Sequence, residues 1–407
     1  MQTQPVTRSS DIAVVGGGPI GLLAACALAT TSRKVACIAP ADPRADGRTT
    51  ALLVDAVDDL RSLGVWEGCA PYAAALRTMR LLDGTRRLIR ARPLEFHASE
   101  LGLDAFGYNV PNERLVAGLN AAAERANVDR HDAVVRSVDP AAGRLVLSND
   151  LSISARLLVG ADGRQSLMRE AAGIPARSWH YDQVAVVLTF SHTQPHNGVS
   201  VELHRETGPF TQVPLPPTPD RPNRSSLVWV ERPAEGARLL DAPDEALAET
   251  IRQRFQGAWG EIAIERRPQS FPLSGQVALT AGKGRTVLVG EATHVFPPIG
   301  AQGANLGFRD VRDLVRHVRE QPLDAVSDAY ARSRAVDIGI RTAGVDMLNR
   351  SLLTGLLPVQ AGRFAAAELM ARSGSLRRAL MKAGLAPSGG AQRDGNGSIG
   401  SRPVVMT

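Results

Sequence analysis

The sequence DIAVVGGGPIGLLAACALATTSRKVACIAP, residues 11–40, decides the fold of the N-terminal region. Residues 12–15 are apolar and β-branched and predict a buried strand, and residues 35–38 predict a second one. Between them, the apolar run over residues 22–28 is long enough for a buried helix. This order of strand, helix and strand predicts a β-α-β unit with a parallel sheet.

Three glycines join the first predicted strand to the helix. Gly16, Gly18 and Gly21 form the pattern G-x-G-x-x-G. Glycines at this spacing allow a tight turn and let the backbone approach a pyrophosphate at the start of the helix. The pattern alone is weak evidence, because glycines also serve ordinary turns. With a strand before it and a helix after it, it predicts a dinucleotide site.

The residue that would hold the adenosine ribose is missing from its usual place. A carboxylate is expected about 20 residues after the glycines. Ala39 and Pro40 stand there instead, and Asp42 follows in the next loop. Asp42 could reach back to the ribose or could be a plain turn residue, and both interpretations stay open.

Further elements of the same domain follow. A helix is predicted from about Thr49, and another over residues 112–124. Residues 155–174, ARLLVGADGRQSLMREAAGI, predict a strand, a tight turn at Asp162 and Gly163, and a helix that ends at Gly173.

Beyond Pro175 the pattern changes to short strands separated by loops rich in Pro, Gly and Asn, which predicts an antiparallel sheet. The buried-strand pattern then returns at residues 285–290. We therefore predict an α/β fold in which a Rossmann-like nucleotide domain is interrupted by an antiparallel substrate domain. The predicted boundaries are 1–70, 107–175 and 275–345 for the first domain, 71–106 and 176–274 for the second, 346–385 for C-terminal helices and 386–407 for a disordered tail.

A second glycine-rich stretch, VGEATHVFPPIGAQGANLGFRD, covers residues 289–310. Glu291 directly follows a predicted strand and could accept hydrogen bonds from a chain of hydroxyl groups. Two prolines stiffen the start of the loop over residues 297–305. The rest of the loop is rich in glycine, so its backbone has little side-chain cover, and it leads into a helix. Free N–H groups at a helix start can stabilise negative charge on a flat ring, as a reduced flavin requires. The alternative is a glycine-rich helix cap without a ligand.

Composition excludes several classes of protein. At 407 residues and 44% apolar content the chain can bury a large core, and it contains no apolar run of the roughly 18 residues that a membrane span needs. The N-terminus has no secretory signal pattern. The three cysteines, Cys26, Cys37 and Cys69, lack paired spacing and predict reduced, packed thiols in a cytoplasmic protein.

Charge and histidine patterns argue against nucleic-acid and metal binding. The net charge is +6, but the arginines are dispersed and aromatic residues make up only 4%. A nucleic-acid surface would need clustered basic and aromatic side chains. His192 and His196 flank a predicted loop without a third ligand, so no metal site is expected.

Three motifs taken in order, VVGGGPIG, LLVGADGRQSLMREAAGI and VLVGEATHVFPPIGAQGANLGFRD, resemble the group A flavin-dependent aromatic hydroxylases. The stretches DGRTTALLVDAVDDLRSLGVW, TGPFTQVPL and YARSRAVDIGIRTAGVDMLNRSLL narrow the resemblance to the ubiquinone-biosynthesis flavin hydroxylase family. The resemblance covers about residues 10–385. It implies FAD as cofactor and NAD(P)H as co-substrate.

The resemblance also implies which residues hold the cofactor. The glycine turn and Arg48 would bind the pyrophosphate, Asp162 and Gly163 would contact FAD and the nicotinamide nucleotide, Glu291 would face the ribityl chain, and the loop up to Asn305 would line the isoalloxazine. Phe210, Gln212 and Pro298 would border the substrate. The complete predicted cofactor set is Gly16, Gly18, Pro19, Ile20, Gly21, Arg48, Asn112, Asp162, Gly163, Glu291, Pro298, Gly300, Ala301, Gln302, Gly303, Ala304 and Asn305.

This chain departs from the family pattern at three places. Glu291 stands where the family usually has Asp, so its longer side chain must sit back or act through water. Asn112 stands where many relatives have Arg or Gln, and either it or Arg114 could face the ring. Pro209 stands where benzoate-type relatives have a phenol-activating Tyr, which predicts a more apolar pocket.

The family chemistry implied is hydride transfer from NAD(P)H to FAD, reaction with O2, and transfer of one OH from a C4a-hydroperoxyflavin to a polyprenylated phenol. It requires no side-chain catalytic dyad, and we predict none. Two alternatives stay open. One is an FAD-dependent reductase or dehydrogenase of an isoprenoid or aromatic substrate. The other is a non-catalytic flavoprotein subunit of a biosynthetic complex.

The C-terminal segment over residues 349–384 combines leucines with six basic side chains. A basic amphipathic helix pair could lie on an anionic membrane surface, which would place the protein on the inner face of the cytoplasmic membrane. It could equally be a packing helix with a solvated basic face, or a docking face for a protein partner. The sequence leaves open the hydroxylated carbon, NADH versus NADPH, the prenyl length and the oligomeric state.

Overall fold

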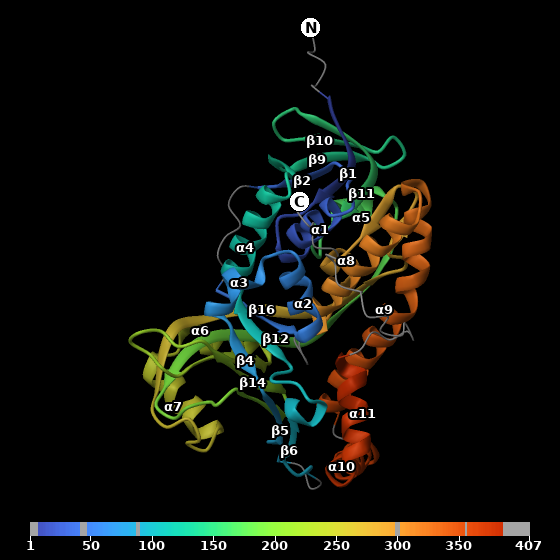
Figure 1. Cartoon of the computed structure of the whole chain (residues 1–407). Coiled ribbons are helices and arrows are strands. Elements are labelled where there is room, and N and C mark those ends of the chain that lie inside the picture. The colour runs from blue at the N-terminus through green and yellow to red at the C-terminus, as the bar shows by residue number, and fades with distance from the viewer. Residues whose placement is uncertain (1–6, 41–46, 87–89, 298–301, 355, 386–407) are drawn as a thin grey trace.

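A computed structural model describes residues 7–40, 47–86, 90–297, 302–354 and 356–385. Its architecture is mixed α/β, with two large sheets and a helical C-terminal segment (Figure 1). Asp42, Pro298, Gly300 and Ala301 lie outside the described residues, as does the tail at 386–407.

The first large sheet contains the predicted β-α-β unit. Strand β1 (Thr7–Val15) pairs in parallel with β2 (Val35–Ala39) on one side and with β11 (Ser152–Gly160) on the other. The sheet has the order β17-β18-β11-β1-β2-β8, and the β9-β10 hairpin adds to β11. The remaining strands are β8 (Asp129–Asp132), β9 (Val135–Asp139), β10 (Arg144–Leu147), β17 (Gly282–Lys283) and β18 (Thr286–Leu288).

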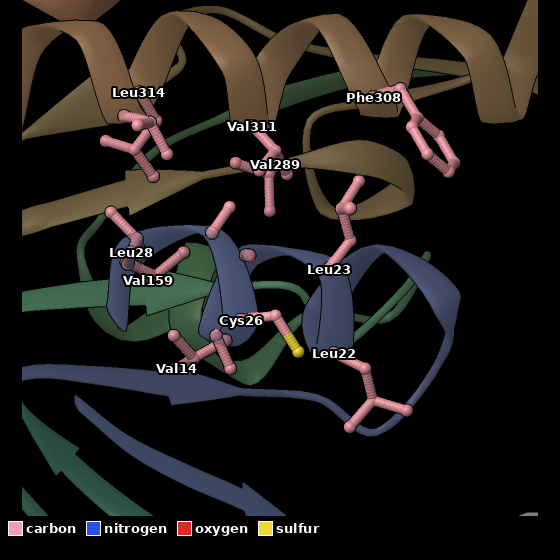
Figure 2. Packing of buried hydrophobic residues seen from close by; sticks show 14 of the residues in the cluster. Val14, Leu22, Leu23, Cys26, Leu28, Val159, Val289, Phe308, Val311 and Leu314 are labelled. Atoms are coloured by element: carbon pink, nitrogen blue, oxygen red, sulfur yellow. The ribbon is translucent and has the colours of Figure 1, made fainter. Parts of the chain in front are cut away.

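Helices cover one face of this sheet and form the larger hydrophobic core. Helix α1 (Pro19–Ala29) packs between the strands and α8 (Gln302–Glu320), with α4 (Asn112–Arg125) beside it. Figure 2 shows α1 side chains meeting Val14 and Val159 of the strands and Val311 and Leu314 of α8. The short helix α5 (Leu167–Ala171) packs on the other face, where Met168 is fully buried. The helix formed by the apolar run at 22–28 is surrounded by the strands, α4 and α8. A helix that is apolar on all sides is stable in such a buried position.

The second large sheet is antiparallel except for one parallel pair, and its order is β19-β16-β12-β15-β14-β13-β5-β6. Helices α6 (Pro233–Asp241) and α7 (Asp244–Arg254) cover one face. The strands predicted after Pro175 are confirmed, and they include β12 (Ala176–His192), β13 (Val199–Arg205), β14 (Gly208–Leu215) and β15 (Arg224–Glu231). The other strands are β5 (Thr78–Asp83), β6 (Leu94–His97), β16 (Ile262–Ala278) and β19 (His294–Val295).

A small third sheet corrects one prediction. The helix predicted from about Thr49 begins only with α2 (Val54–Ser62), because Thr49–Leu53 forms strand β3. This strand pairs antiparallel with β7 (Gly107–Pro111), which also pairs with β4 (Ala74–Leu76). The apolar spacing suited a helix, but two adjacent β-branched threonines and a partner strand far along the chain made the extended form more stable. A short helix α3 (Trp66–Cys69) and two 3₁₀ turns, Ala70–Tyr72 and Ala98–Leu101, complete this region.

The chain ends in three helices, α9 (Leu323–Leu353), α10 (Leu357–Arg372) and α11 (Gly374–Leu385). Helix α9 joins the two large sheets: Tyr330 donates to the Leu288 carbonyl (3.0 Å), and Tyr181 of β12 donates to Asp346 (2.7 Å). Figure 1 shows α10 and α11 beside β5 and β6, at the end remote from β1. In the parts of the chain that the structure describes, no helix has the length and apolarity to cross a bilayer.

Candidate cofactor and substrate site

In the N-terminal glycine turn, two glycines allow close backbone packing and the third faces open space. A Cβ on Gly16 would lie 2.2 Å from the Ala161 carbonyl oxygen, and one on Gly21 would lie 2.1 Å from the Gly16 carbonyl oxygen. A Cβ on Gly18, at the N-cap of α1, would meet no atom within 4 Å. The turn therefore leaves an open space at the helix start, which is the geometry that a pyrophosphate needs.

The end of β2 offers no carboxylate within the described residues. Ala39 is buried, and a Cβ on Gly17 would lie 2.6 Å from the Ala39 methyl carbon. A side chain at position 17 would therefore collide with Ala39, so close packing between the turn and β2 requires the glycine there.

The second glycine motif packs directly against the first. A Cβ on Gly307 of α8 would lie 2.8 Å from the Ile20 Cδ1, and one on Gly290 would lie 3.1 Å from the Ile20 Cγ2. Ile20 of the N-terminal glycine motif thus touches Gly290 and Gly307 of the stretch at residues 289–310. A Cβ on Gly303, in the first turn of α8, would meet no described atom within 4 Å. The starts of α1 and α8 are therefore brought together, with open space beside each.

Asn305 connects α8 to β3. Its Oδ1 accepts from the Leu53 backbone N–H (2.9 Å), and its Nδ2 donates to the Ala51 carbonyl (2.8 Å). The side chain is buried, so these two bonds hold the start of α8 against the strand. Ala304 is half-buried beside it, and Gln302 begins the helix.

A short 3₁₀ turn, η3 (Gly290–Ala292), presents Glu291 at the end of β18. Gly290 has φ of +61°, a conformation that favours glycine. Glu291 is exposed, and no hydrogen bond or ion pair engages its carboxylate within the described residues. The exposed carboxylate is thus accessible, and its predicted role toward a chain of hydroxyl groups stays a prediction.

Asp310, buried in α8, holds this turn. Its Oδ2 accepts from the Gly290 N–H (2.9 Å) and pairs with His294 Nε2 (2.7 Å), and its Oδ1 accepts from Arg334 Nε (2.9 Å). Burial acts to raise the pKa of Asp310, but the charges of His294 and Arg334 and the Gly290 N–H lower it below the ordinary value. Asp337 extends the buried network, since it accepts from Arg334 Nη1 (2.8 Å) and from Arg341 Nε (2.9 Å).

The middle motif is tied to this turn through an arginine. Arg169 donates from Nη1 to the Ala292 carbonyl (3.0 Å). The Asp162 carboxylate accepts from the Ser166 hydroxyl (2.5 Å) and from the Met168 N–H (3.0 Å), so it secures the start of α5. Gly163 has φ of +80°, with no atom within 4 Å of a Cβ placed on it. Asp162 thus has a local structural role, and the open backbone belongs to Gly163.

Two of the uncertain polar residues are now placed. Asn112 accepts from the Thr50 hydroxyl (2.5 Å), so it faces β3, whereas the Arg114 guanidinium lies 3.8 Å from the Tyr72 ring centroid. Arg48 lies at the start of β3, and its guanidinium is 5.5 Å from the ring centroid of Phe271 in β16. Arg48 therefore spans from the small sheet to the antiparallel sheet.

The side-chain alternation of β14 determines where the predicted substrate residues Phe210 and Gln212 lie. Phe210 is fully buried and packs on Phe255 next to α7, with 5.0 Å between ring centroids. Gln212 lies on the same face, and its Nε2 donates to the Ser225 hydroxyl (2.8 Å). Successive strand residues point to opposite faces, so Thr211 faces the other way. The positions of Phe210 and Gln212 therefore do not support their prediction as substrate contacts.

The face that carries Thr211 looks toward β3 of the small sheet. Thr211 lies opposite Val228 in β15, and two residues along that strand Ser226 meets the Thr49 hydroxyl of β3 (3.5 Å). The Thr211 hydroxyl oxygen is buried and has no partner within the described residues. The sequence does not distinguish the two faces of this strand, because only the strand register determines which side chains point to which side.

The histidines outside this site have structural partners. His192 contacts the Gln194 carbonyl (2.7 Å) and the Ser225 hydroxyl (2.9 Å), and His196 contacts the Leu215 carbonyl (3.2 Å). Burial lowers the pKa of both. Among the described residues, no group of metal-ligating side chains is close enough to hold an ion.

Comparison with known proteins agrees with this geometry. The family model described as FAD binding domain matches residues 9–335. Ubiquinone hydroxylase UbiL of Rhodospirillum rubrum is 33% identical over 404 residues, covering 93% of this chain and 91% of that protein. The 3-demethoxyubiquinol 3-hydroxylase of Escherichia coli is 29% identical over 410 residues, covering 94% and 99%.

Solved structures share the fold. The p-nitrophenol 4-monooxygenase PnpA from Pseudomonas putida DLL-E4 has a TM-score of 0.74 at 17% identity, over 94% of this chain and 100% of that one. PqsL of P. aeruginosa, in complex with 2-aminobenzoylacetate, has a TM-score of 0.73 at 19% identity, over 89% and 100%.

Proposed function

Because this chain belongs to the FAD-binding domain family and is an FAD-dependent hydroxylase of ubiquinone biosynthesis, we propose that it hydroxylates the ring of a polyprenylated phenol. The enzyme uses NAD(P)H as co-substrate, and the proposed oxygen donor is O2. The observation that carries the proposal is the convergence of three distant motifs, in which Ile20 touches Gly290 and Gly307 and Arg169 binds the Ala292 carbonyl.

The described residues fit an FAD molecule. The open side of Gly18 would take the pyrophosphate, the free Glu291 carboxylate would accept from the ribityl hydroxyls, and the open side of Gly303 would face the ring. Arg48 would approach the cofactor from β3. When bound, FAD supplies the hydride-accepting and oxygen-activating chemistry, which amino-acid side chains cannot provide.

The chain's own residues would then perform three tasks. The start of α8, a helix of 19 residues, directs N–H groups and the positive end of its dipole toward the site, which stabilises negative charge there. The antiparallel sheet would cover the site and exclude water. Its facing side chains, Val228 and Val230 among them, are apolar, and Thr211 offers one buried hydroxyl that can bond a ring substituent.

A tyrosine base is absent from the part of this face that the structure describes. Tyr181 is the tyrosine that packs there, and it donates to Asp346 (2.7 Å) while it accepts from Trp179 (2.6 Å). Burial, together with the Asp346 charge, raises the pKa of Tyr181 to about 12. The residue therefore stays protonated at neutral pH, and the proposed reaction relies on substrates whose ring is already electron-rich.

A prenyl tail partitions into lipid, so this substrate would be met at a membrane. We propose a peripheral position on the inner face of the cytoplasmic membrane, held by the protein's own surface or by other proteins of the pathway. The location follows from the proposed substrate and from the basic C-terminal helices.

The test is isotopic. Purified FAD-loaded protein is incubated with NAD(P)H, ¹⁸O2 and a short-chain prenyl phenol, and the product is analysed by mass spectrometry. One ¹⁸O atom in the product supports the proposal. NAD(P)H oxidation that yields a reduced product without ¹⁸O would support the reductase alternative, and bound flavin that is never reduced would support the non-catalytic one. In cells, deletion of the gene should cause a quinone precursor that lacks one ring hydroxyl group to accumulate.

A further inference from the structure

Large apolar side chains are exposed mainly on the C-terminal helices. Within the described residues, seven of the ten exposed large apolar side chains lie between residues 336 and 380, and Met347 and Leu356 are 71% and 65% exposed. Single exposed apolar residues are normal on a protein surface, but a concentration in one region marks an interaction site. The seven are Val336, Ile340, Met347, Leu356, Phe364, Leu369 and Leu380.

Helix α9 presents three of these residues as a stripe. Val336, Ile340 and Met347 recur at the helical spacing and lie on one side, with exposed Arg332 and Arg350 before and after them. The opposite side carries the buried Arg334 network and is packed against the protein. The stripe is therefore apolar in the middle and basic at both ends.

The same region has a strongly positive net charge. Residues 346–385 contain six basic and two acidic side chains, a net charge of +4, whereas the whole chain carries +6. Both acidic residues are already neutralised, since Asp346 pairs with Arg350 (2.8 Å) and Glu368 with Arg372 (3.3 Å). Arg378 and Lys382 are exposed and form no ion pair within the described residues.

We infer that α9, α10 and α11 form a docking surface for a lipid bilayer that contains anionic lipid. Such a bilayer accepts apolar side chains in its interior and basic ones among its headgroups. A second copy of this chain fits less well, because a symmetric dimer through this surface would bring two regions of net charge +4 together. The inference deepens the proposed function and rests on it, because a prenylated substrate places the enzyme at a membrane.

The surface is held rigidly to the body near the cofactor site. Arg377 of α11 makes a two-pronged ion pair with Glu100, with the shortest distance 2.7 Å, and Met381 is buried against Ala98 and Phe106. At the end of α11, the Leu385 carbonyl accepts from Arg309 Nη2 (2.8 Å). Arg309 is one helical turn from Asn305, which holds the start of α8. Docking would therefore bring the bilayer close to the flavin-binding end, so that a prenyl tail could remain in lipid during reaction.

The experiment is co-sedimentation of full-length, FAD-loaded protein with vesicles of phosphatidylcholine, alone or mixed with phosphatidylglycerol. Binding should require phosphatidylglycerol. A basic side chain near an anionic surface changes partitioning about fivefold, so Arg378→Gln with Lys382→Gln should weaken binding about 25-fold. Phe364→Ser with Leu369→Ser should abolish it.

Matched controls carry the same substitutions elsewhere. Val134→Ser with Leu279→Ser replaces apolar residues that are as exposed, and Arg136→Gln with Arg238→Gln removes two exposed charges. Both should bind as the natural protein does. Equal losses in the controls, no binding to anionic vesicles, or a dimer that Met347→Arg dissociates would each overturn the inference.

A second readout separates this inference from the proposed function. Hydroxylation of a short-tail phenol in detergent should be unchanged in the four docking substitutions, because none of them lies in the cofactor site. If vesicles are bound but this phenol is never hydroxylated, the docking surface stands and the proposed function fails.

Discussion

Asp310→Asn tests whether the buried network holds the cofactor-facing turn. The natural carboxylate is fully buried and neutralises Arg334, while it also fixes Gly290 and His294. Asparagine keeps the size and one acceptor oxygen but removes the charge, so Arg334 retains only Asp337 as an acidic partner. Removal of one partner from a buried ion pair costs about 3–5 kcal/mol. We expect the lower end of that range, because one acceptor oxygen is preserved.

Urea unfolding followed by tryptophan fluorescence measures the change, with Asp324→Asn as the control. Asp324 pairs with Arg156 at 3.5 Å on the surface, and its side chain is 70% exposed. Exposed pairs contribute about 0–1 kcal/mol, so the control should unfold almost as the natural protein does. A loss below about 1 kcal/mol for Asp310→Asn would refute the assigned role of the network.

The pH dependence of this difference provides a second check. The pKa of Asp310 is lowered in the folded protein, so its contribution to stability is present above the unfolded value of about 3.9 and is lost as pH falls through the folded pKa. The gap between the natural protein and Asp310→Asn should stay constant from about pH 5 to 8 and shrink below about pH 4. A gap that closes near neutrality would contradict the assignment of the effect to the Asp310 carboxylate. The FAD dissociation constant, measured by flavin fluorescence, should rise in the variant because η3 loses its anchor.

Four further predictions concern other parts of the molecule. Gly18→Ala adds a methyl group where no atom lies within 4 Å, so it should weaken FAD binding but leave urea unfolding unchanged. Gly21→Ala places a methyl carbon 2.1 Å from the Gly16 carbonyl oxygen, so it should also destabilise the cofactor-free protein. Thr211→Val should lower kcat/KM for hydroxylation about 2- to 12-fold, the value of one neutral hydrogen bond, while Thr211→Ser should retain it and neither should alter FAD titration. Burial raises the pKa of Cys26 to about 12 and of Cys37 and Cys69 to about 11, so a disulfide reagent at pH 8 should modify no thiol in the native protein and three in urea. Hydrogen bonds from Arg377 lower the pKa of Glu100, so its contribution to α11 docking is lost as pH falls below about 4, and amide exchange in α11 should accelerate there and in Glu100→Gln.

Several features of the fold and site were predictable because they depend on local chemistry. The strand, glycine turn and helix over residues 7–39 follow from apolar runs and from Gly16 and Gly21, where any larger residue would collide with the backbone. The middle motif was placed correctly as a strand, turn and helix, but its Asp162 serves the start of α5. A carboxylate beside a turn looks alike in sequence whether it caps a helix or contacts a ligand.

Other features depend on partners that are remote in the chain. Thr49–Leu53 became a strand because Gly107–Pro111 lies beside it, and an apolar spacing that suits a helix cannot reveal that partner. The role of Asp310 was likewise hidden, because its partners Gly290 and Arg334 are 20 and 24 residues away on other elements.

By itself, the sequence determined the cofactor class and the order of the elements, because glycine spacing, helix starts and buried strands are properties of short segments. Only the tertiary structure decided which side chains point where. Strand register placed Thr211, and not Phe210, toward β3 of the small sheet, and the packing of α8 against η3 buried Asp310 beside Gly290. The physical reason is that orientation depends on pairing between distant segments, and a shift of one residue turns every side chain of a strand to the opposite face.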